Sequence, residues 1–128
     1  MSMAKKTSIH WHRKPDDDNY PAARSFLSLL FDENEARRLV KRLKQADSVG
    51  YKAIDVLRAS REPLLDVTNS HVKEDHQMIV EGKPLSPPML VRDVRDSRVI
   101  IADGYHRLCA VCSFDEDAEV PCRIVSGD

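Results

Sequence analysis

The segment Asp103-Gly104-Tyr105-His106-Arg107 contains the residues of this chain that are best suited to chemistry. It follows an apolar run typical of a buried strand and precedes apolar residues at helical spacing. A glycine at such a turn lets the backbone approach a ligand, and the first N–H groups of a helix are unpaired and carry the positive end of its dipole. His106 and Arg107 add donors, and the guanidinium is a planar fork that suits phosphate. The segment therefore predicts a phosphate site at Gly104, Tyr105, His106 and Arg107.

Acid–base chemistry at this turn would require a carboxylate. Asp103 is the first candidate, followed by Glu62 and Asp66 in the polar connection before a predicted helix. Asp103 has a second interpretation as the N-cap of the helix that follows it, a role that needs no ligand. Both interpretations of Asp103 stay open at this point.

The three cysteines raise the alternative of a zinc site. His106, Cys109 and Cys112 recur every third residue, and Cys122 supplies a fourth donor. Steps of three along one helix rotate side chains around its axis, whereas structural zinc takes ligands from loops with paired spacing. We therefore predict no metal site, and expect the three cysteines to be buried, reduced and dispensable.

Composition limits the classes of protein that fit. A chain of 128 residues corresponds to one domain, and its 20 basic and 21 acidic residues argue against a dominant nucleic-acid surface. No apolar stretch approaches the roughly 18 residues that span a bilayer, and the polar N-terminal segment lacks the apolar core of a secretory signal. An odd number of cysteines argues against a disulfide framework, so a cytoplasmic location is expected.

The first half of the chain is predicted to be helical. Residues 1–19 are expected to form a mobile arm, in which Trp11 packs and His10 and His12 are an alternative metal pair that we do not favour. Apolar residues at helical spacing predict helices over 20–30 and 33–47, so that residues 20–50 form a helical extension.

Residues 53–57 fit either a short strand or a helical turn, and a helix is predicted from Asn69 or Ser70 to Glu81, with Gly82 ending it. After Gly82 the chain changes to strand patterns. Strands are predicted over 89–92, 98–102 and 121–125, with a helix that begins within two residues of Gly104. Pro121 predicts an edge position or a strand start. Together these elements predict an α+β fold.

Residues 84–125 resemble the ParB/sulfiredoxin superfamily. The similarity rests on PLSPPMLVRD, VIIADGYHRLCAV and VPCRIV, which occur in the family's order. ADGYHR also resembles the DGHHR motif of ParB-related proteins that include a free-serine kinase. The resemblance implies a small mixed sheet of ParB/sulfiredoxin type, with an added N-terminal helical pair, in one domain over residues 20–128.

The family motifs imply nucleotide binding at the same turn. In sulfiredoxins a Gly-Cys-His-Arg motif binds ATP phosphates, and Gly104, His106 and Arg107 match it. Tyr105 stands at the position of the reductant cysteine, so sulfinic acid reduction is not expected. In ParB proteins a Gly-Glu-Arg-Arg motif binds CTP; Gly104 and Arg107 match, but the Glu is missing, so CTP hydrolysis is not expected. The implied cofactor is ATP, ADP or CTP.

The sequence thus predicts a nucleotide- or phosphate-binding domain, and its sharpest enzymatic form is a phosphotransferase acting on a small molecule. Its expected partner is a nucleotide or a phosphorylated small molecule, without nucleic acid or membrane. An alternative from another class is a non-catalytic module that binds a protein or is associated with DNA. The nucleotide, the acceptor and the oligomeric state stay open.

Overall fold

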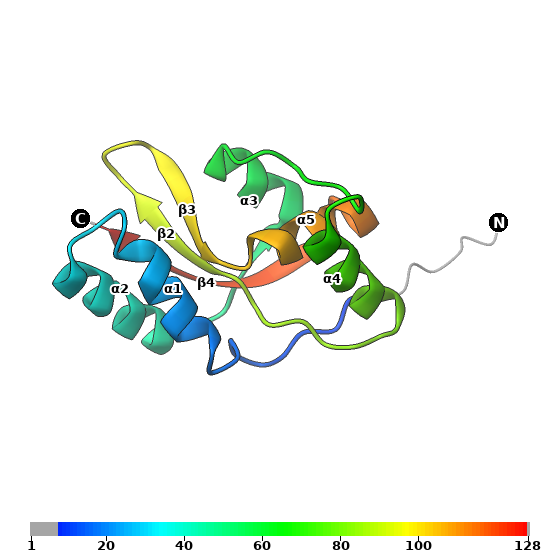
Figure 1. Ribbon diagram of the computed structural model, residues 1–128, viewed down its shortest axis with the longest axis horizontal. Helices are drawn as coiled ribbons and strands as arrows, with labels where there is room; N and C mark the ends of the chain where they lie inside the picture. The colour runs from blue at the N-terminus through cyan, green and yellow to red at the C-terminus, as the bar shows by residue number, and fades with distance from the viewer. Residues whose placement is uncertain (1–7, 128) are drawn as a thin grey trace.

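A computed structural model describes residues 8–127, in which five helices flank a four-stranded mixed sheet, an α+β fold. The helices are α1 (Asn19–Leu27), α2 (Glu33–Gln45), α3 (Ala53–Ser60), α4 (Ser70–Val80) and α5 (Tyr105–Asp115). The strands are β1 (Val49–Lys52), β2 (Met89–Asp93), β3 (Arg98–Asp103) and β4 (Glu119–Gly127). Figure 1 shows α1 and α2 on one side of the sheet and α3, α4 and α5 on the other.

The strands lie in the order β1-β4-β2-β3. β1 pairs antiparallel with β4 and β3 antiparallel with β2, whereas β2 and β4 run parallel. Because β3 is the outer strand, α5 must carry the chain back across the sheet to β4. The antiparallel pairing of Met89 with Asp103 places the β3–α5 turn beside the first residue of β2, where the candidate site lies.

Both faces of the sheet bury apolar side chains. Successive side chains of a strand point to opposite faces, so neighbouring residues of β2 belong to different clusters. Met89 and Val91 of β2 pack with α1 and α2, while Leu90 between them packs with α3 and α5. Strands that are buried on both faces read as continuous apolar runs, and this is why the sequence identified β2 and β3.

Most of the predicted elements are confirmed. β2, β3 and β4 match the three predicted strands, and α5 begins at Tyr105, one residue after Gly104. Pro121 lies in β4, an inner strand, but the ladder to β2 starts only at Arg123, so residue 121 pairs on one side alone.

Residues 53–57 belong to helix α3, which decides between the two predicted alternatives in favour of the helical turn. Three details differ from the prediction. The strand β1 that precedes α3 was missed, because its side chains are mostly exposed and show no apolar alternation. The first helix ends at Leu27, which leaves Leu29 and Leu30 outside it and exposed. In place of a mobile arm, residues 10–12 pair with the segment before β2, and residues 13–18 bend and turn into α1.

The contacts of this segment centre on Trp11 and Leu85. The two residues form a parallel bridge, and the backbone N–H of Leu85 donates to the carbonyl of His10 at 2.9 Å. Trp11 packs on the apolar cluster of α3, α4 and α5, as predicted for a lone large aromatic. Nδ1 of His12 lies 2.6 Å from Oδ1 of Asp16. Residues 1–7 of the predicted arm lie outside the described residues.

Candidate anion-binding site

The turn between β3 and α5 has a backbone that only glycine adopts easily. Gly104 has φ of 102° and ψ of 17°, in the left-handed region, and is the N-cap of α5. A Cβ atom at this position would lie 2.8 Å from Cβ of Pro88. Among residues 8–127, no side chain caps the N-terminus of α5. The first N–H groups of α5 are therefore left for a ligand or for water.

A bulge in β3 changes the direction of the Asp103 side chain, just before this turn. Ile101 pairs with Leu90 and Asp103 pairs with Met89, so Ala102 is an additional residue in the ladder. Such a bulge changes the direction in which the next side chain projects and often occurs beside functional sites. Here it precedes Asp103, whose side chain reaches α5.

Asp103 forms an ion pair with Arg107. Nη2 of Arg107 donates to Oδ2 of Asp103 at 2.5 Å, and the two side chains are 16% and 14% exposed. The interpretation of Asp103 as the N-cap is therefore wrong, since Gly104 holds that position. Burial raises the pKa of Asp103, and the positive charge of Arg107 opposes this rise. The pair holds the guanidinium in place at the first turn of α5.

The Tyr105 and His106 side chains are also held by neighbours. The Tyr105 hydroxyl donates to the carbonyl of Pro63, and burial is the main cause that raises its pKa to about 12. The His106 ring lies 5.3 Å from the Tyr105 ring and 4.9 Å from the ring of His71, measured between centroids. Tyr105 therefore stays protonated and structural at neutral pH, while His106 has a second imidazole beside it.

Helix α4 contributes two residues that the sequence analysis missed. His71 and Asp75 are four residues apart, a spacing that places them on one helix face. Burial raises the pKa of Asp75, and the charges of Arg107 and then His106 oppose this rise. The spacing of His71 and Asp75 was readable in the sequence, but the packing of α4 on α5 was not.

A cavity of about 290 Å³ opens beside the turn. Its lining combines the two sequence candidates Glu62 and Asp103 with Gly104, Tyr105 and His106, and the remaining lining residues are Phe26, Arg98, Ile100, Ile101 and Ala102. Within the described part of the chain, Nε of Arg98 and Nε of Arg107 are buried and have no hydrogen-bond partner. Unpaired guanidinium donors favour an anionic ligand.

Asp66, the third candidate carboxylate, is not in this lining. Its Oδ1 accepts from the backbone N–H of Thr68 at 2.9 Å and from the Thr68 hydroxyl at 2.5 Å. These hydrogen bonds lower the pKa of Asp66. Asp66 thus holds the turn that leads into α4, and the structure brings only Glu62 and Asp103 to the phosphate turn.

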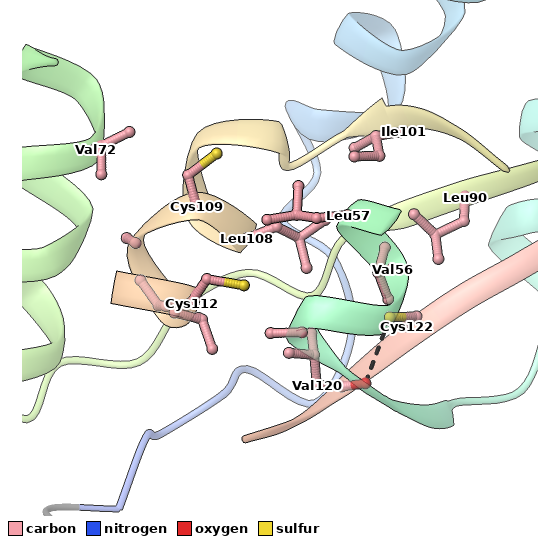
Figure 2. Packing of buried hydrophobic residues seen from close by; sticks show 14 of the residues in the cluster. Val56, Leu57, Val72, Leu90, Ile101, Leu108, Cys109, Cys112, Val120 and Cys122 are labelled. Carbon is pink, nitrogen blue, oxygen red and sulfur yellow. Dashed lines mark hydrogen bonds between the residues drawn. The ribbon is translucent and has the colours of Figure 1, made fainter. Parts of the chain in front are cut away.

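The three cysteines lie in the apolar core, as Figure 2 shows for Cys109 and Cys112 on α5 and Cys122 on β4. Burial raises the pKa of Cys112 and of Cys122 to about 12, and Sγ of Cys122 donates to the Val120 carbonyl at 3.4 Å. Thiols with such raised pKa values are poor nucleophiles and poor metal ligands. Within residues 8–127, no group of three or more His, Cys, Asp or Glu side chains is placed to hold a metal ion.

Comparisons with protein-family models, with curated proteins and with solved structures find no match to this chain. Over the described residues, no helix is long and apolar enough to span a bilayer.

Proposed function

We propose that this chain is a nucleotide- or phosphate-binding domain of the ParB/sulfiredoxin type, formed by residues 20–128 and acting in the cytoplasm. Its phosphate site is the first turn of α5, from Gly104 to Arg107. The observation that carries the proposal is that an N-terminus which no described side chain caps adjoins a cavity of about 290 Å³. The DGYHR resemblance supports the same turn independently.

In this proposal both the backbone and the basic side chains contact the ligand. The N–H groups at the start of α5 bind phosphate oxygens, because the helix dipole favours negative charge there. His106 and Arg98 line the cavity, where an imidazole and a guanidinium can donate to phosphate oxygens. Arg107, held by Asp103, adds positive charge behind the turn. A cavity of this volume is at the lower end of the range for small-molecule sites and holds ATP, ADP or CTP only in part.

The enzymatic form of the proposal is transfer of a terminal phosphoryl group to a hydroxyl of a small molecule. Glu62 is the general base, because it lines the cavity, while Asp103 serves as the counter-ion of Arg107 and Asp66 holds a turn. Glu62 accepts the hydroxyl proton as the hydroxyl oxygen bonds to phosphorus. The bond from phosphorus to the bridging oxygen breaks, and the nucleoside diphosphate leaves with the electron pair.

Calorimetric titration with ATP, ADP and CTP tests the binding step. His106→Ala and Arg98→Ala should each weaken binding by roughly tenfold, since a charge-assisted hydrogen bond contributes about 1.5 kcal/mol or more. Arg58→Ala is the matched control, because Arg58 is an exposed arginine of α3 whose nearest acid, Asp55, lies 3.8 Å away. If none of the three nucleotides binds, or if all variants bind with equal affinity, the assignment of a nucleotide site to this turn is wrong. Glu62→Gln should abolish phosphoryl transfer. Its nucleotide affinity should stay within twofold of wild type, which corresponds to a change in binding free energy below about 0.5 kcal/mol.

One observation favours the alternative, a non-catalytic protein-binding module. Phe26, Leu29 and Leu30, at or just after the end of α1, are 42%, 83% and 48% exposed. Exposed apolar patches commonly mark protein interfaces. The titration separates the two functions, because a protein-binding module does not require affinity for any nucleotide.

A further inference from the structure

A groove follows the outer edge of the sheet and ends at the phosphate turn. β3 is the outermost strand, and the cavity of about 290 Å³ is lined by Arg98, by each residue from Ile100 to Ala102, and by Asp103 and Gly104. Successive residues of a strand point to opposite faces, so a lining of consecutive residues places the groove along the strand edge. A second cavity, of about 440 Å³, shares Arg98 and Ile100 with the first and continues it toward the β2–β3 turn.

Helix α1 contributes an exposed aromatic ring to this groove. Phe26 is 42% exposed and lines the first cavity together with Gly104 and His106. Leu29 is more exposed but lines neither cavity, and Leu30 lines only the second of the two. Among these three exposed apolar residues, Phe26 is therefore the one that shares a cavity with the phosphate turn.

We propose that the ring of Phe26 is the stacking platform for the base of a nucleotide whose phosphates bind at the first turn of α5. This inference rests on the proposed function and adds to it a base subsite on the N-terminal helical extension. It also narrows the ligand to a nucleoside polyphosphate, because a phosphorylated molecule without a planar ring gains nothing from stacking on Phe26.

The length of the groove suits a ligand of this shape. Leu30, four residues after Phe26, lines the second cavity, which places Phe26 toward the junction of the two cavities and away from the phosphate turn. At about 3.3 Å per residue, the strand from Ile100 at that junction to Gly104 spans roughly 13 Å. This span leaves room for a ribose between the base and the phosphates. The second cavity accommodates the part of the nucleotide that the first does not hold.

The strand edge favours a flat base over an extended peptide. A peptide that adds a strand to a sheet pairs with backbone groups of the edge along several residues. In the middle of β3, Ile100, Ile101 and Ala102 are only 3%, 8% and 5% exposed, so little of their backbone is open to such pairing. Stacking on Phe26 needs no backbone pairing, because it uses the faces of the two rings. Arg98 lines both cavities, and its positive charge complements the phosphates of the same ligand.

Calorimetric titrations of ATP and of inorganic tripolyphosphate separate the base subsite from the phosphate turn. Phe26→Ala should weaken ATP binding by roughly tenfold, as is typical for the loss of one stacked base, and should leave tripolyphosphate binding within about twofold of wild type. Phe26→Tyr keeps an aromatic ring and should bind ATP as the wild type does. Each ligand is compared with itself across the variants, so the different charges of ATP and tripolyphosphate cancel.

Leu29→Ala is the matched control, because it removes an apolar side chain that is more exposed than Phe26 and lines neither cavity. It should leave both affinities unchanged. If Phe26→Ala binds ATP as tightly as the wild type, or weakens the binding of both ligands equally, the base subsite is wrong and the proposed function stands. If neither ATP nor tripolyphosphate binds to the wild type, both are wrong. Melting temperatures of the three variants confirm that each is folded.

Discussion

Helices α2 and α5 begin in opposite ways. At α2, Oδ1 of Asp32 accepts from the backbone N–H of Glu35 at 2.8 Å, and Glu33 and Glu35 add negative charge to the first turn. At α5, the N-cap is Gly104, which has no side chain, and the first turn contains no acidic residue. The α2 terminus therefore satisfies its own N–H groups and dipole, whereas the α5 terminus leaves both to a ligand.

The two helices also differ in how deeply they are buried. The buried residues of α2 are Ala36, Leu39 and Leu43, a single stripe that faces the sheet. In α5 the five consecutive residues 108–112 are buried, because the helix lies between the sheet and α4. The polar first turn of α5 is thus attached to one of the most buried segments of the chain. A rigid support of this kind positions a binding group better than a surface helix does.

The largest effect is expected from a side chain at Gly104. Gly104→Ala should lower the free energy of unfolding by about 2–4 kcal/mol, because left-handed backbone strain adds to overlap with Pro88. Gly82→Ala is the control, since Gly82 has φ of 72° but nothing within 4 Å of an added Cβ. It should cost only about 1 kcal/mol. Equal losses in urea unfolding would show that the close approach to Pro88 does not matter.

Arg107→Ala is expected to destabilise the domain by about 2–3 kcal/mol, because it leaves the mostly buried Asp103 carboxylate without its partner. The double variant Asp103→Asn with Arg107→Ala should recover part of this loss, since no lone charge then remains. Denaturant unfolding of the two variants measures the difference. A double variant that is no more stable than Arg107→Ala would indicate that the pair contributes little.

Asp32→Ala removes the side-chain hydrogen bond that caps the N-terminus of α2. It should lower the free energy of unfolding by about 1 kcal/mol, the usual contribution of an N-cap side chain. Nucleotide affinity should not change, because α2 takes no part in the site. Thermal unfolding and calorimetric titration of the same sample provide both values. Weaker ATP binding in this variant would contradict the assignment of the site to α5 alone.

The smallest effect is expected at the cysteines. Since burial raises the pKa of Cys112 and Cys122 to about 12 and also raises that of Cys109, iodoacetamide near pH 8 should label the native protein very slowly. The same reagent should label all three thiols in urea. Mass spectrometry counts the added groups. Rapid labelling of native Cys109 would indicate an accessible thiolate close to the phosphate turn.

Elements with strong local patterns were predictable from the sequence. The apolar runs of β2 and β3, the apolar stripe of α2 and the Asn69 cap of α4 all specify their own structure. β1 was not predictable, because its exposed residues are held by backbone pairing with β4. At the candidate site, the sequence indicated the turn at Gly104. The Asp103–Arg107 pair and the His71–His106 contact depend on a bulge and on helix packing, neither of which has a local sequence signal.

The most direct test of the central claim is a titration of ATP followed by two-dimensional NMR of the backbone amides. The amides of Tyr105, His106 and Arg107 should show the largest chemical-shift changes, and those of residues 33–35 in α2 should stay unchanged. Changes concentrated away from α5, or no changes at millimolar ATP, would contradict the claim that the open N-terminus of α5 is a phosphate site.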